Sequence, residues 1–299
     1  MPASNPRVVL RQQLAAGELI VAPGVFDGIS ASLTARLGFG AAYLTGAGVA
    51  ASGFGLPDIG LVTQTEMVER ARMIVRATDG LPVIADADTG YGAVLNVVRT
   101  VREYETAGVA AIQLEDQAFP KKCGHLPDKD LIGADEFAVK IEAAVDTRID
   151  PDLVIIARTD ARGPFGIDEA IARANRYADA GADVIFVEAP QSVDEIERIA
   201  KEVSAPLLIN LVVGGLTPLE STQRLNELGY AIAIYPTVPL HAAAVAMLSG
   251  LAELAGRDPA EFMPNDIAGL FQLVGLAEWS GIGDRFPTTG TSVQNGPNK

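Results

Sequence analysis

The sequence has little that could form covalent or metal-based cross-links, since it contains one cysteine and two histidines among 299 residues. One cysteine excludes an internal disulfide and any cysteine-rich metal module. Basic residues are also scarce, with 23 Lys and Arg against 38 Asp and Glu, so the net charge is -15. A field of this sign repels phosphate backbones and anionic lipid, so we expect neither nucleic acid nor a membrane surface as a partner.

Targeting segments are not predicted either. The first residues, MPASNPRVVLRQQL, lack the long apolar run of a signal peptide. No stretch of ~18 or more uncharged apolar residues follows them, as a transmembrane helix would require. We therefore expect a cytoplasmic protein.

Eight short runs rich in Val and Ile recur along the chain, each closed by a polar or charged residue. They are Leu19–Ala22, Ala41–Thr45, Leu81–Asp86, Ala110–Glu115, Leu153–Arg158, Asp183–Glu188, Pro206–Asn210 and Ala231–Tyr235. Continuous apolar runs of this length predict strands that are buried on both faces, as in a parallel sheet. The helical patterns between them include Glu66–Ala77, Val94–Ala107, Asp135–Ala144, Asp168–Ala180 and Val193–Val203.

This alternation predicts an α/β fold, a (β/α)8 TIM-type barrel rather than an open doubly wound sheet. No linker divides the chain, so we expect one barrel domain over residues 1–285. Two further helical stretches, Pro239–Leu254 and Pro259–Trp279, follow the eighth predicted strand. Residues 286–299 are polar, and we expect a disordered tail there.

The active site of such a barrel lies at the C-terminal ends of the strands. Polar side chains stand at or just after these ends, namely Asp86, Asp88, Glu115, Asp116, Arg158, Asp160, Glu188 and Asn210. Asp86 and Asp88 share a face of their strand because they are two residues apart. With Glu115 they would repel each other unless a cation neutralised them, and an all-oxygen set favours Mg²⁺. The alternative is that these acids cap helices or pair with Arg158.

The segment from Glu115 to His125, EDQAFPKKCGH, holds the single cysteine in a long connection between a strand and a helix. A connection of this length indicates a lid. Lys121 and the nearby imidazole would lower the pKa of the Cys123 thiol and make it a competent acid or base. The alternative is an inert buried cysteine. We expect no zinc here, since no second ligand pair completes a site, and we interpret His241 as a structural histidine.

The glycine-rich run Thr45–Ala51, TGAGVAA, matches the dinucleotide pattern G-x-G-x-x-A after a predicted strand. The next residues, SGFGLP, leave no room for the long helix that would hold a pyrophosphate, so we reject this motif. The run could still offer backbone amides to a substrate carboxylate. P-loop and serine-hydrolase motifs do not occur in the sequence.

Eight short motifs are spread over most of the chain, from about Arg11 to Leu254. They are Tyr43–Gly46 (YLTG), Gly55–Asp58 (GLPD), Asp86–Gly92 (DADTGYG), Leu114–Gln117 (LEDQ), Pro120–His125 (PKKCGH), Ala157–Ala161 (ARTDA), Phe186–Pro190 (FVEAP) and Thr217–Leu219 (TPL). In combination they resemble the isocitrate lyase and phosphoenolpyruvate mutase superfamily. The PKKCGH segment resembles its lyase branch, with 2-methylisocitrate lyases, 2,3-dimethylmalate lyases and 2-alkylmalate lyases as the most similar groups.

The resemblance implies cleavage of the C2–C3 bond of a 2-hydroxy dicarboxylate. The products would be an α-keto acid such as pyruvate and a second carboxylic acid. The resemblance also implies a Mg²⁺ ion, with Mn²⁺ as a substitute. Asp86 would be the direct metal ligand, and Asp58, Asp88 and Glu115 would hold metal-bound waters.

Further roles are implied by the same resemblance. The implied substrate-binding residues are Tyr43, Thr45, Gly46, Ala47, Arg158, Glu188 and Asn210. The implied catalytic residues are Lys121, Cys123, Gly124, His125 and Arg158. Among them, Arg158 would bind the carboxylate of the α-keto acid, and Cys123 would deliver a proton to the carbanionic product.

Two departures leave the substrate open. Asn210 is followed by LVVGG, where methylisocitrate lyases typically carry a Glu, and Ile234–Thr237 does not match a tricarboxylate lyase. An alkylmalate or an oxaloacetate-like substrate therefore fits as well as methylisocitrate. The alternatives are an oxaloacetate hydrolase or decarboxylase, a phosphonopyruvate-type carbon–phosphorus enzyme, and a catalytically silent barrel.

The resemblance also implies a homotetramer, a dimer of dimers. In it the last barrel helix, at Leu240–Leu254, is swapped between subunits. The alternative is that this helix packs on its own barrel.

Overall fold

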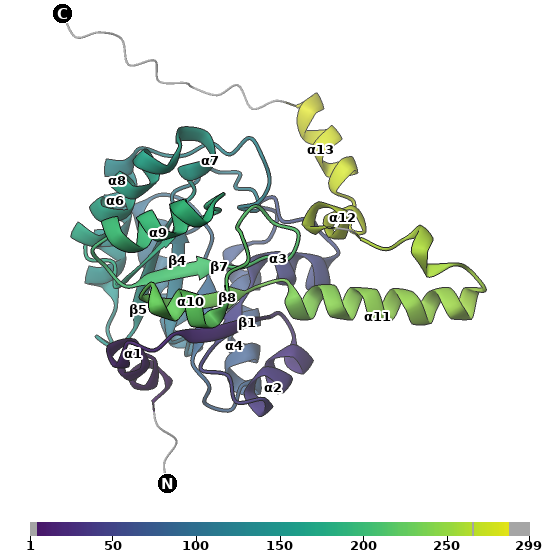
Figure 1. The fold of residues 1–299 in the computed structure, drawn as a ribbon, viewed down its shortest axis with the longest axis horizontal. Helices are drawn as coiled ribbons and strands as arrows, with labels where there is room; N and C mark the ends of the chain where they lie inside the picture. Colours follow the sequence, from purple (N-terminus) through teal and green to yellow (C-terminus); the bar gives the residue numbers. More distant parts are fainter. Residues whose placement is uncertain (1–4, 265, 287–299) are drawn as a thin grey trace, which may run out of the picture.

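A computed structural model describes residues 5–264 and 266–286 of the chain. Eight parallel strands form one closed barrel, in which each strand pairs with the next and β8 returns to β1 (Figure 1). The strands are β1 (Ile20–Val25), β2 (Ala42–Leu44), β3 (Val83–Asp86), β4 (Ala111–Glu115), β5 (Val154–Thr159), β6 (Val184–Val187), β7 (Leu207–Asn210) and β8 (Tyr230–Tyr235). The predicted barrel and its eight strands are confirmed.

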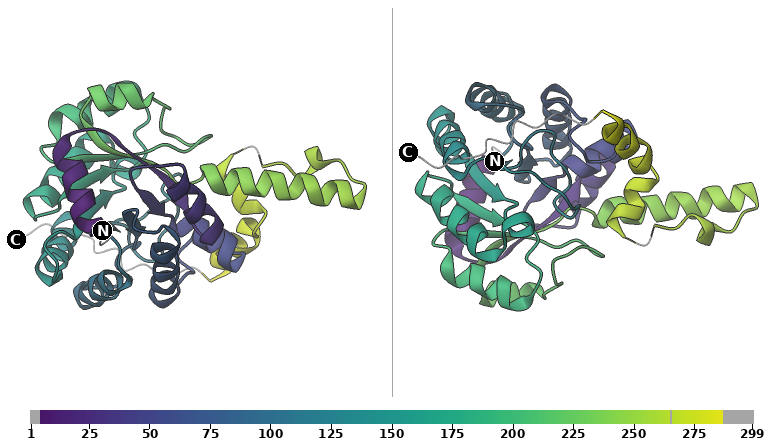
Figure 2. Two further views of the ribbon diagram at one scale, coloured as in Figure 1. Left: turned by 90° about the horizontal axis from the view of Figure 1, so that it is seen from below. Right: turned by 90° about the horizontal axis from the view of Figure 1, so that it is seen from above.

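Helices surround the barrel (Figure 2). The longer ones of this outer ring are α2 (Gly28–Arg36), α4 (Gln64–Ala77), α5 (Val94–Ala107), α6 (Ala134–Thr147), α8 (Ile167–Asp179), α9 (Val193–Glu202) and α10 (Thr222–Glu227). Short helical turns follow two strands, as α3 (Gly46–Val49) with the π-helix η1 (Ala50–Phe54) after β2, and α7 (Arg162–Phe165) after β5. The five helices predicted between strands are present, with ends that differ by at most a few residues.

One helix before the barrel, α1 (Pro6–Ala16), was not predicted from the sequence. Its single buried residue, Leu10, packs with the side chains inside the barrel, so α1 closes the N-terminal end of the ring. Two arginines fasten it there. Arg7 donates to the Val109 carbonyl at 3.0 Å, and the Arg11 guanidinium lies 2.8 Å from the Asp183 carboxylate. Leu14 is partly buried against the same cluster. The apolar face of α1 is therefore narrow, and such a face is a weak signal of a helix in the sequence.

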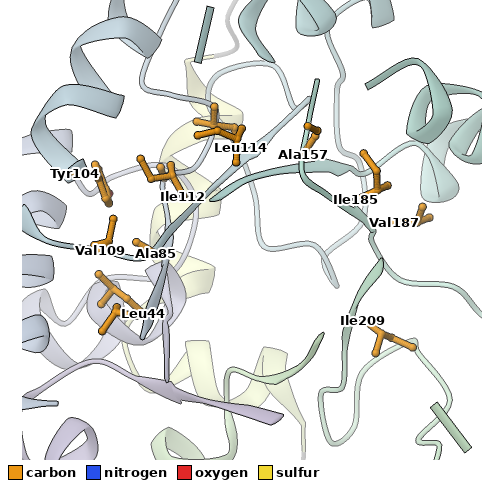
Figure 3. Packing of buried hydrophobic residues seen from close by; sticks show 14 of the residues in the cluster. Leu44, Ala85, Tyr104, Val109, Ile112, Leu114, Ala157, Ile185, Val187 and Ile209 are labelled. Atoms are coloured by element: carbon orange, nitrogen blue, oxygen red, sulfur yellow. The ribbon is translucent and has the colours of Figure 1, made fainter. Parts of the chain in front are cut away.

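Side chains of the strands alternate between two apolar clusters. The outward set, which includes Leu44, Ala85, Ile112 and Ile185, packs against the helices (Figure 3). The inward set fills the ring and includes Ile84 of β3. Because successive residues of a strand point to opposite faces, the inward rows continue toward the C-terminal ends of the strands. The functional candidates lie at those ends.

The C-terminal region differs from the prediction. The first expected helix is present as α11 (Val238–Ala255), but the second is divided into the 3-10 turn η2 (Pro259–Glu261), α12 (Ile267–Gln272) and α13 (Leu276–Arg285). The positive φ of Gly275, +81°, separates α12 from α13, since a left-handed residue cannot continue a helix. Of the expected disordered tail, residues 287–299 lie outside the described residues.

Helix α11 projects away from the barrel instead of packing along it (Figures 1 and 2). Only Leu240 and Ala252 of its 18 residues are buried. Its mean hydropathy is 1.5, so in the described part of the chain it is the one helix long and apolar enough to span a membrane. This surface needs a covering that the chain itself does not supply in its described part.

Candidate active site

The inward rows of five strands change from apolar to polar at the same end of the barrel. In β3, Ile84 is followed two residues later by Asp86, and in β7 Leu208 is followed by Asn210. The same spacing places Glu115, Arg158 and Glu188 above the apolar interior, and the strand register pairs Glu115 with Arg158. Period-two geometry therefore brings side chains from distant parts of the sequence into one site.

Most of the predicted site residues line a single cavity at this end. They are Tyr43, Thr45, Ala47, Asp58, Asp86, Lys121, Cys123, Gly124, His125, Arg158, Glu188 and Asn210. Gly46 and Asp88 line an adjoining cavity that shares Asp58 and Lys121. Four further residues of the wall are Val212, Pro236, Thr237 and Ile267. Pro236 and Thr237 belong to the segment Ile234–Thr237 that the sequence had indicated, whereas Ile267 was not predicted.

Three aspartates and one lysine form the first charged group of the site. Asp86 accepts from the backbone N–H of Gly46 at 3.2 Å and of Asp88 at 3.1 Å. Asp88 lies beyond the end of β3 with a φ of +47°, so the turn, and not strand alternation, aims it at the site. The Lys121 Nζ is 2.6 Å from Asp58 Oδ1 and 2.7 Å from Asp88 Oδ1. The expected repulsion is therefore relieved in part by a protein ammonium, which the sequence argument did not consider.

Burial and neighbouring charges determine the protonation states of Lys121 and Asp88. Burial lowers the pKa of Lys121, but the carboxylates of Asp58 and Asp88 outweigh it, so the pKa lies well above its usual value. Burial raises the pKa of Asp88 to about 7, although Lys121 opposes the shift. Lys121 is thus a permanent cation at neutral pH.

Arg158 is the centre of the second charged group. Its guanidinium contacts Asp160 at 2.9 Å, Glu188 at 3.2 Å and Glu115 at 3.3 Å, and it lies 5.2 Å from the centre of the Phe186 ring. Burial lowers the pKa of Arg158, but these three carboxylates outweigh it and raise the pKa well above its usual value. The arginine that was predicted to bind substrate is therefore held rigidly by the barrel.

The carboxylates fit a hard cation that is held largely through water. Burial raises the pKa of Glu115 far above its usual value, and neither of its oxygens has a hydrogen-bond partner in the described part of the chain. Among residues 5–264 and 266–286, no three acidic, histidine or cysteine side chains converge as a ready-made metal site. A Mg²⁺ ion here would have Asp86 as its direct ligand, with Asp58, Asp88 and Glu115 reaching it through waters, several of which Mg²⁺ usually keeps.

The long connection between β4 and α6 covers the cavity. An isolated antiparallel bridge between Gln117 and Leu131 closes its base. Near its middle, the Cys123 N–H donates to the Asp58 carbonyl at 3.0 Å, and both Lys121 and Cys123 are buried. The expected lid is therefore present and lies closed over the site.

The predicted activation of Cys123 is wrong. Burial, followed by the nearby Asp58 carboxylate, raises the pKa of the thiol to about 12. Lys121 does not lower it enough because its charge is shared with Asp58 and Asp88. His125 supplies no positive charge, since burial lowers its own pKa. Cys123 is thus a thiol at neutral pH, a state that can donate a proton but is a weak base.

His125 joins the lid to two strand ends. Its Nδ1 accepts from the Leu216 N–H at 3.1 Å, and its Nε2 lies 3.3 Å from Asn210 Nδ2 and 3.6 Å from Glu188 Oε1. Asn210 in turn donates to Glu188 at 3.2 Å. His241, in contrast, lies half-buried on α11 beside another cavity and is not part of this group.

The glycine-rich run after β2 forms only α3 and one π turn, so the rejection of a dinucleotide site is consistent with the fold. The Thr45 hydroxyl caps this turn by accepting from the Gly48 N–H at 3.2 Å. The Tyr43 hydroxyl donates to Gln113 at 2.9 Å. Gln113 was not predicted, although its inward position two residues before Glu115 could have indicated it.

Comparison with known proteins agrees with this site. Residues 10–255 match the family model described as phosphoenolpyruvate phosphomutase. The chain belongs to the phosphoenolpyruvate mutase and isocitrate lyase superfamily. It is 52% identical over 244 residues to the 2,3-dimethylmalate lyase of Eubacterium barkeri, covering 82% of this chain and 84% of the relative. It is 46% identical over 253 residues to the 2-methylisocitrate lyase of Aeropyrum pernix, covering 85% and 81%.

Solved structures show the same relationship. A crystal structure of 2,3-dimethylmalate lyase superposes with a TM-score of 0.83 at 38% identity, with 100% of each chain covered. An oxaloacetate acetylhydrolase with bound 3,3-difluorooxalacetate gives a TM-score of 0.80 at 38% identity, with 95% and 96% covered. A phosphonopyruvate hydrolase solved with oxalate and Mg²⁺ gives 0.73 at 30% identity, with 95% and 100% covered. Members of the superfamily thus bind Mg²⁺.

Proposed function

We propose that this protein is a carbon–carbon lyase that cleaves the C2–C3 bond of a 2-hydroxy dicarboxylate with an alkyl substituent. The products are an α-keto acid such as pyruvate and a second carboxylic acid. One observation carries the proposal: a buried thiol, that of Cys123, lines the same cavity as the fixed guanidinium of Arg158. A protonated thiol suits a reaction that ends by protonating a carbanion.

The chain's own residues bind the substrate and order the charges around it. Arg158 attracts one carboxylate of the substrate and keeps it in place, because Asp160 and Phe186 fix its guanidinium. Asn210, which donates to Glu188, and His125 line the other end of the cavity, where the leaving acid would form. The lid excludes water from the reacting carbons, which protects the carbanionic product from protonation by solvent.

Proton transfer completes the reaction. As the C2–C3 bond breaks, its electron pair stays on C3 and the C2 hydroxyl oxygen becomes the keto oxygen. The hydroxyl proton passes to a carboxylate of the cavity, from which it later returns to the Cys123 thiolate. The Cys123 S–H bond then breaks and its proton goes to C3, which leaves a thiolate next to Lys121 and releases the second acid. The ammonium of Lys121 stabilises that thiolate.

We propose Mg²⁺ as the cofactor, with Asp86 as its direct protein ligand and Mn²⁺ as a substitute. When bound, the ion would polarise the hydroxyl and carboxylate oxygens of the substrate and lower the energy of the alkoxide. Asp58, Asp88 and Glu115 would hold its water shell. The buried Oε1 of Glu115, which has no hydrogen-bond partner among the described residues, supports this assignment.

The wall of the cavity supports a small alkyl-substituted malate over a tricarboxylate. Val212, Pro236 and Ile267 present apolar surface to it. Arg158 is already surrounded by three carboxylates, and Lys121 by two. A third substrate carboxylate would therefore meet apolar side chains or neutral donors, and leaving a charge unpaired is costly. We therefore place 2,3-dimethylmalate ahead of 2-methylisocitrate.

A substrate panel tests the proposal. The purified protein with Mg²⁺ is incubated with 2,3-dimethylmalate, 2-alkylmalates, 2-methylisocitrate, isocitrate, oxaloacetate and phosphonopyruvate, and pyruvate, glyoxylate and oxalate are measured. We expect pyruvate from malates with a methyl group at C2, such as 2,3-dimethylmalate, and its loss in Cys123→Ser. Oxalate from oxaloacetate alone would identify a hydrolase instead. Turnover of phosphonopyruvate that survives Cys123→Ser would identify a carbon–phosphorus enzyme, and no turnover at all would indicate a silent barrel.

We also propose that the enzyme is a cytoplasmic homotetramer, a dimer of dimers, in which α11 is exchanged between subunits. The groove between α2 and α11 is lined by apolar residues that include Ile29, Leu33 and Met247, and these three are 73%, 54% and 61% exposed. A second copy of the chain can cover both sides of this groove with the same surface, as an isologous contact requires. The acidic net charge of -15 supports this over insertion of α11 into an anionic membrane.

A further inference from the structure

A buried lysine in the lid, Lys129, has no role in the reaction described above. Its ammonium lies 2.9 Å from Asp160 Oδ1 and also donates to the Gly124 carbonyl. Gly124 belongs to the part of the lid that enters the cavity, whereas Asp160 follows β5 in the barrel. Lys129 therefore connects the lid to the barrel.

Asp160 is the partner that orients Arg158. Its two oxygens accept from Arg158 Nε and Nη2, each at 2.9 Å, in a two-pronged contact that fixes the plane of the guanidinium. The backbone N–H of Asp160 donates to Asp116 Oδ1 at 2.9 Å, so the barrel holds Asp160 from behind. The Asp160 carboxylate thus accepts hydrogen bonds from both Arg158 and Lys129.

The backbone of Gly124 lies directly against the same arginine. A Cβ at this position would be 2.4 Å from Arg158 Nη2 and 2.6 Å from the Glu188 carboxyl carbon, so only glycine can approach so closely. If the lid moves outward, the Lys129 ammonium leaves Asp160 and the space beside Arg158 opens. The position of the lid and the surroundings of the arginine therefore change together.

The contact between Lys129 and Asp160 also changes the balance of charge around Arg158. Arg158 contacts three carboxylates, those of Asp160, Glu115 and Glu188, and an incoming substrate carboxylate adds a further negative charge. The ammonium of Lys129 neutralises Asp160 and so leaves more of the Arg158 charge to attract the substrate. Because Lys129, Asp160 and Arg158 are buried, the Lys129 charge acts on them more strongly than it would in water.

We propose that Lys129 is a positioning residue that latches the lid to Asp160 and couples closure of the lid to the readiness of Arg158 for a substrate carboxylate. The part that concerns carboxylate binding rests on the proposed function. The latch itself does not, because it concerns only the contacts of the lid. Lys129 touches neither the substrate nor the thiol in this scheme.

The accessibility of Cys123 measures the latch without substrate. Iodoacetamide labelling of the single cysteine reports how often the lid opens, since the thiol is buried when the lid is closed. We expect Lys129→Met to accelerate labelling about tenfold or more, the change in an opening equilibrium that loss of a charged hydrogen bond produces. Lys122→Met is the matched control, because Lys122 donates only to the Asp128 carbonyl within the lid, and it should label at the wild-type rate.

Steady-state kinetics test whether Lys129 also prepares Arg158 to bind a substrate carboxylate. Lys129→Met should raise KM about tenfold or more, with a smaller change in kcat, and Lys129→Arg should restore part of the affinity by returning the charge. If Lys129→Met does not fold, Lys129→Gln, which keeps a donor without the charge, takes its place. Labelling and KM at wild-type values in a folded variant would overturn the proposal. Faster labelling in a protein that cleaves no malate would keep the latch and reject the lyase.

Discussion

At the scale of single residues, the site is a set of charges that compensate one another. Lys121 neutralises Asp58 and Asp88, and Arg158 serves three carboxylates. The sequence identified nearly all of these residues, because charges at the ends of buried strands are conspicuous. It could not show which charge pairs with which. The pKa of Cys123 was predicted in the wrong direction because the sequence shows neither the burial of the thiol nor the pairing of Lys121 with Asp58 and Asp88.

The thiol gives a prediction of pH dependence. With a pKa raised to about 12, Cys123 exposes little thiolate at neutral pH, so its alkylation in the closed protein should speed up about tenfold per pH unit up to pH ~10. In urea the rate should level off near the ordinary thiol pKa of about 8.5. Both alkylation rates, that of the folded protein and that of the protein in urea, are measured by quenching the labelling at successive times and analysing the protein by mass spectrometry. A plateau below pH ~9 in the folded protein would contradict the burial of the thiol.

Removal of Lys121 should destabilise the protein strongly. Lys121→Met leaves Asp58 and Asp88 buried without their cation, and breaking a buried pair in this way costs about 3–5 kcal/mol. Urea unfolding followed by circular dichroism measures the loss. Lys122→Met removes the same charge from the neighbouring position and should change the free energy of unfolding by less than about 0.5 kcal/mol. Equal effects of the two variants would refute the account of this pair.

At the scale of elements, the strands of the barrel could be predicted from the sequence, but the chain segments before and after the barrel could not be predicted as well. Strands such as β6 are buried on both faces, so their Val, Ile and Phe residues form continuous runs that identify them. Helix α1 escaped prediction because it is fixed by Arg7 and Arg11 more than by an apolar face. The link from Lys129 to Asp160 joins residues 31 apart through the fold, and no spacing in the sequence reveals such a contact.

The lid offers a prediction at this scale. Gly124→Ala places a methyl group 2.4 Å from Arg158 Nη2, so the lid cannot close fully and turnover should fall about hundredfold. Gly133→Ala is the control at the other end of the same connection, since a Cβ there has no neighbour within 4 Å and φ is -58°. Steady-state assays of both variants measure the effect. Unchanged turnover in Gly124→Ala would show that closure against Arg158 is not needed.

At the scale of the whole molecule, the exposed helix α11 is the feature that needs explanation. Its residues Met247, Leu251 and Leu254 are 61%, 64% and 86% exposed, far more than a core helix allows. The sequence indicated an apolar helix here but not whether it packs on its own barrel. The structure shows it projecting from the barrel, which is the arrangement that exchange between subunits requires (Figure 2).

Charges placed on α11 should therefore dissociate the assembly. We expect Met247→Glu with Leu251→Glu to convert a tetramer into smaller species, because each change buries a carboxylate in an apolar contact. Sedimentation velocity measures the outcome. Leu95→Glu on α5, where the side chain is 82% exposed, is the control and should leave the tetramer intact. A wild-type monomer, or a protein recovered with membranes, would contradict exchange of α11.

The central claim is that the protein breaks a carbon–carbon bond and that Cys123 returns the proton. Proton NMR of the reaction with 2,3-dimethylmalate and Mg²⁺ in D₂O tests both parts in one measurement. The account predicts pyruvate and propionate in equal amounts, with one deuterium at C2 of the propionate, and release slowed about hundredfold or more in Cys123→Ser. No cleavage by the wild type, or equal rates in the two proteins, would contradict it.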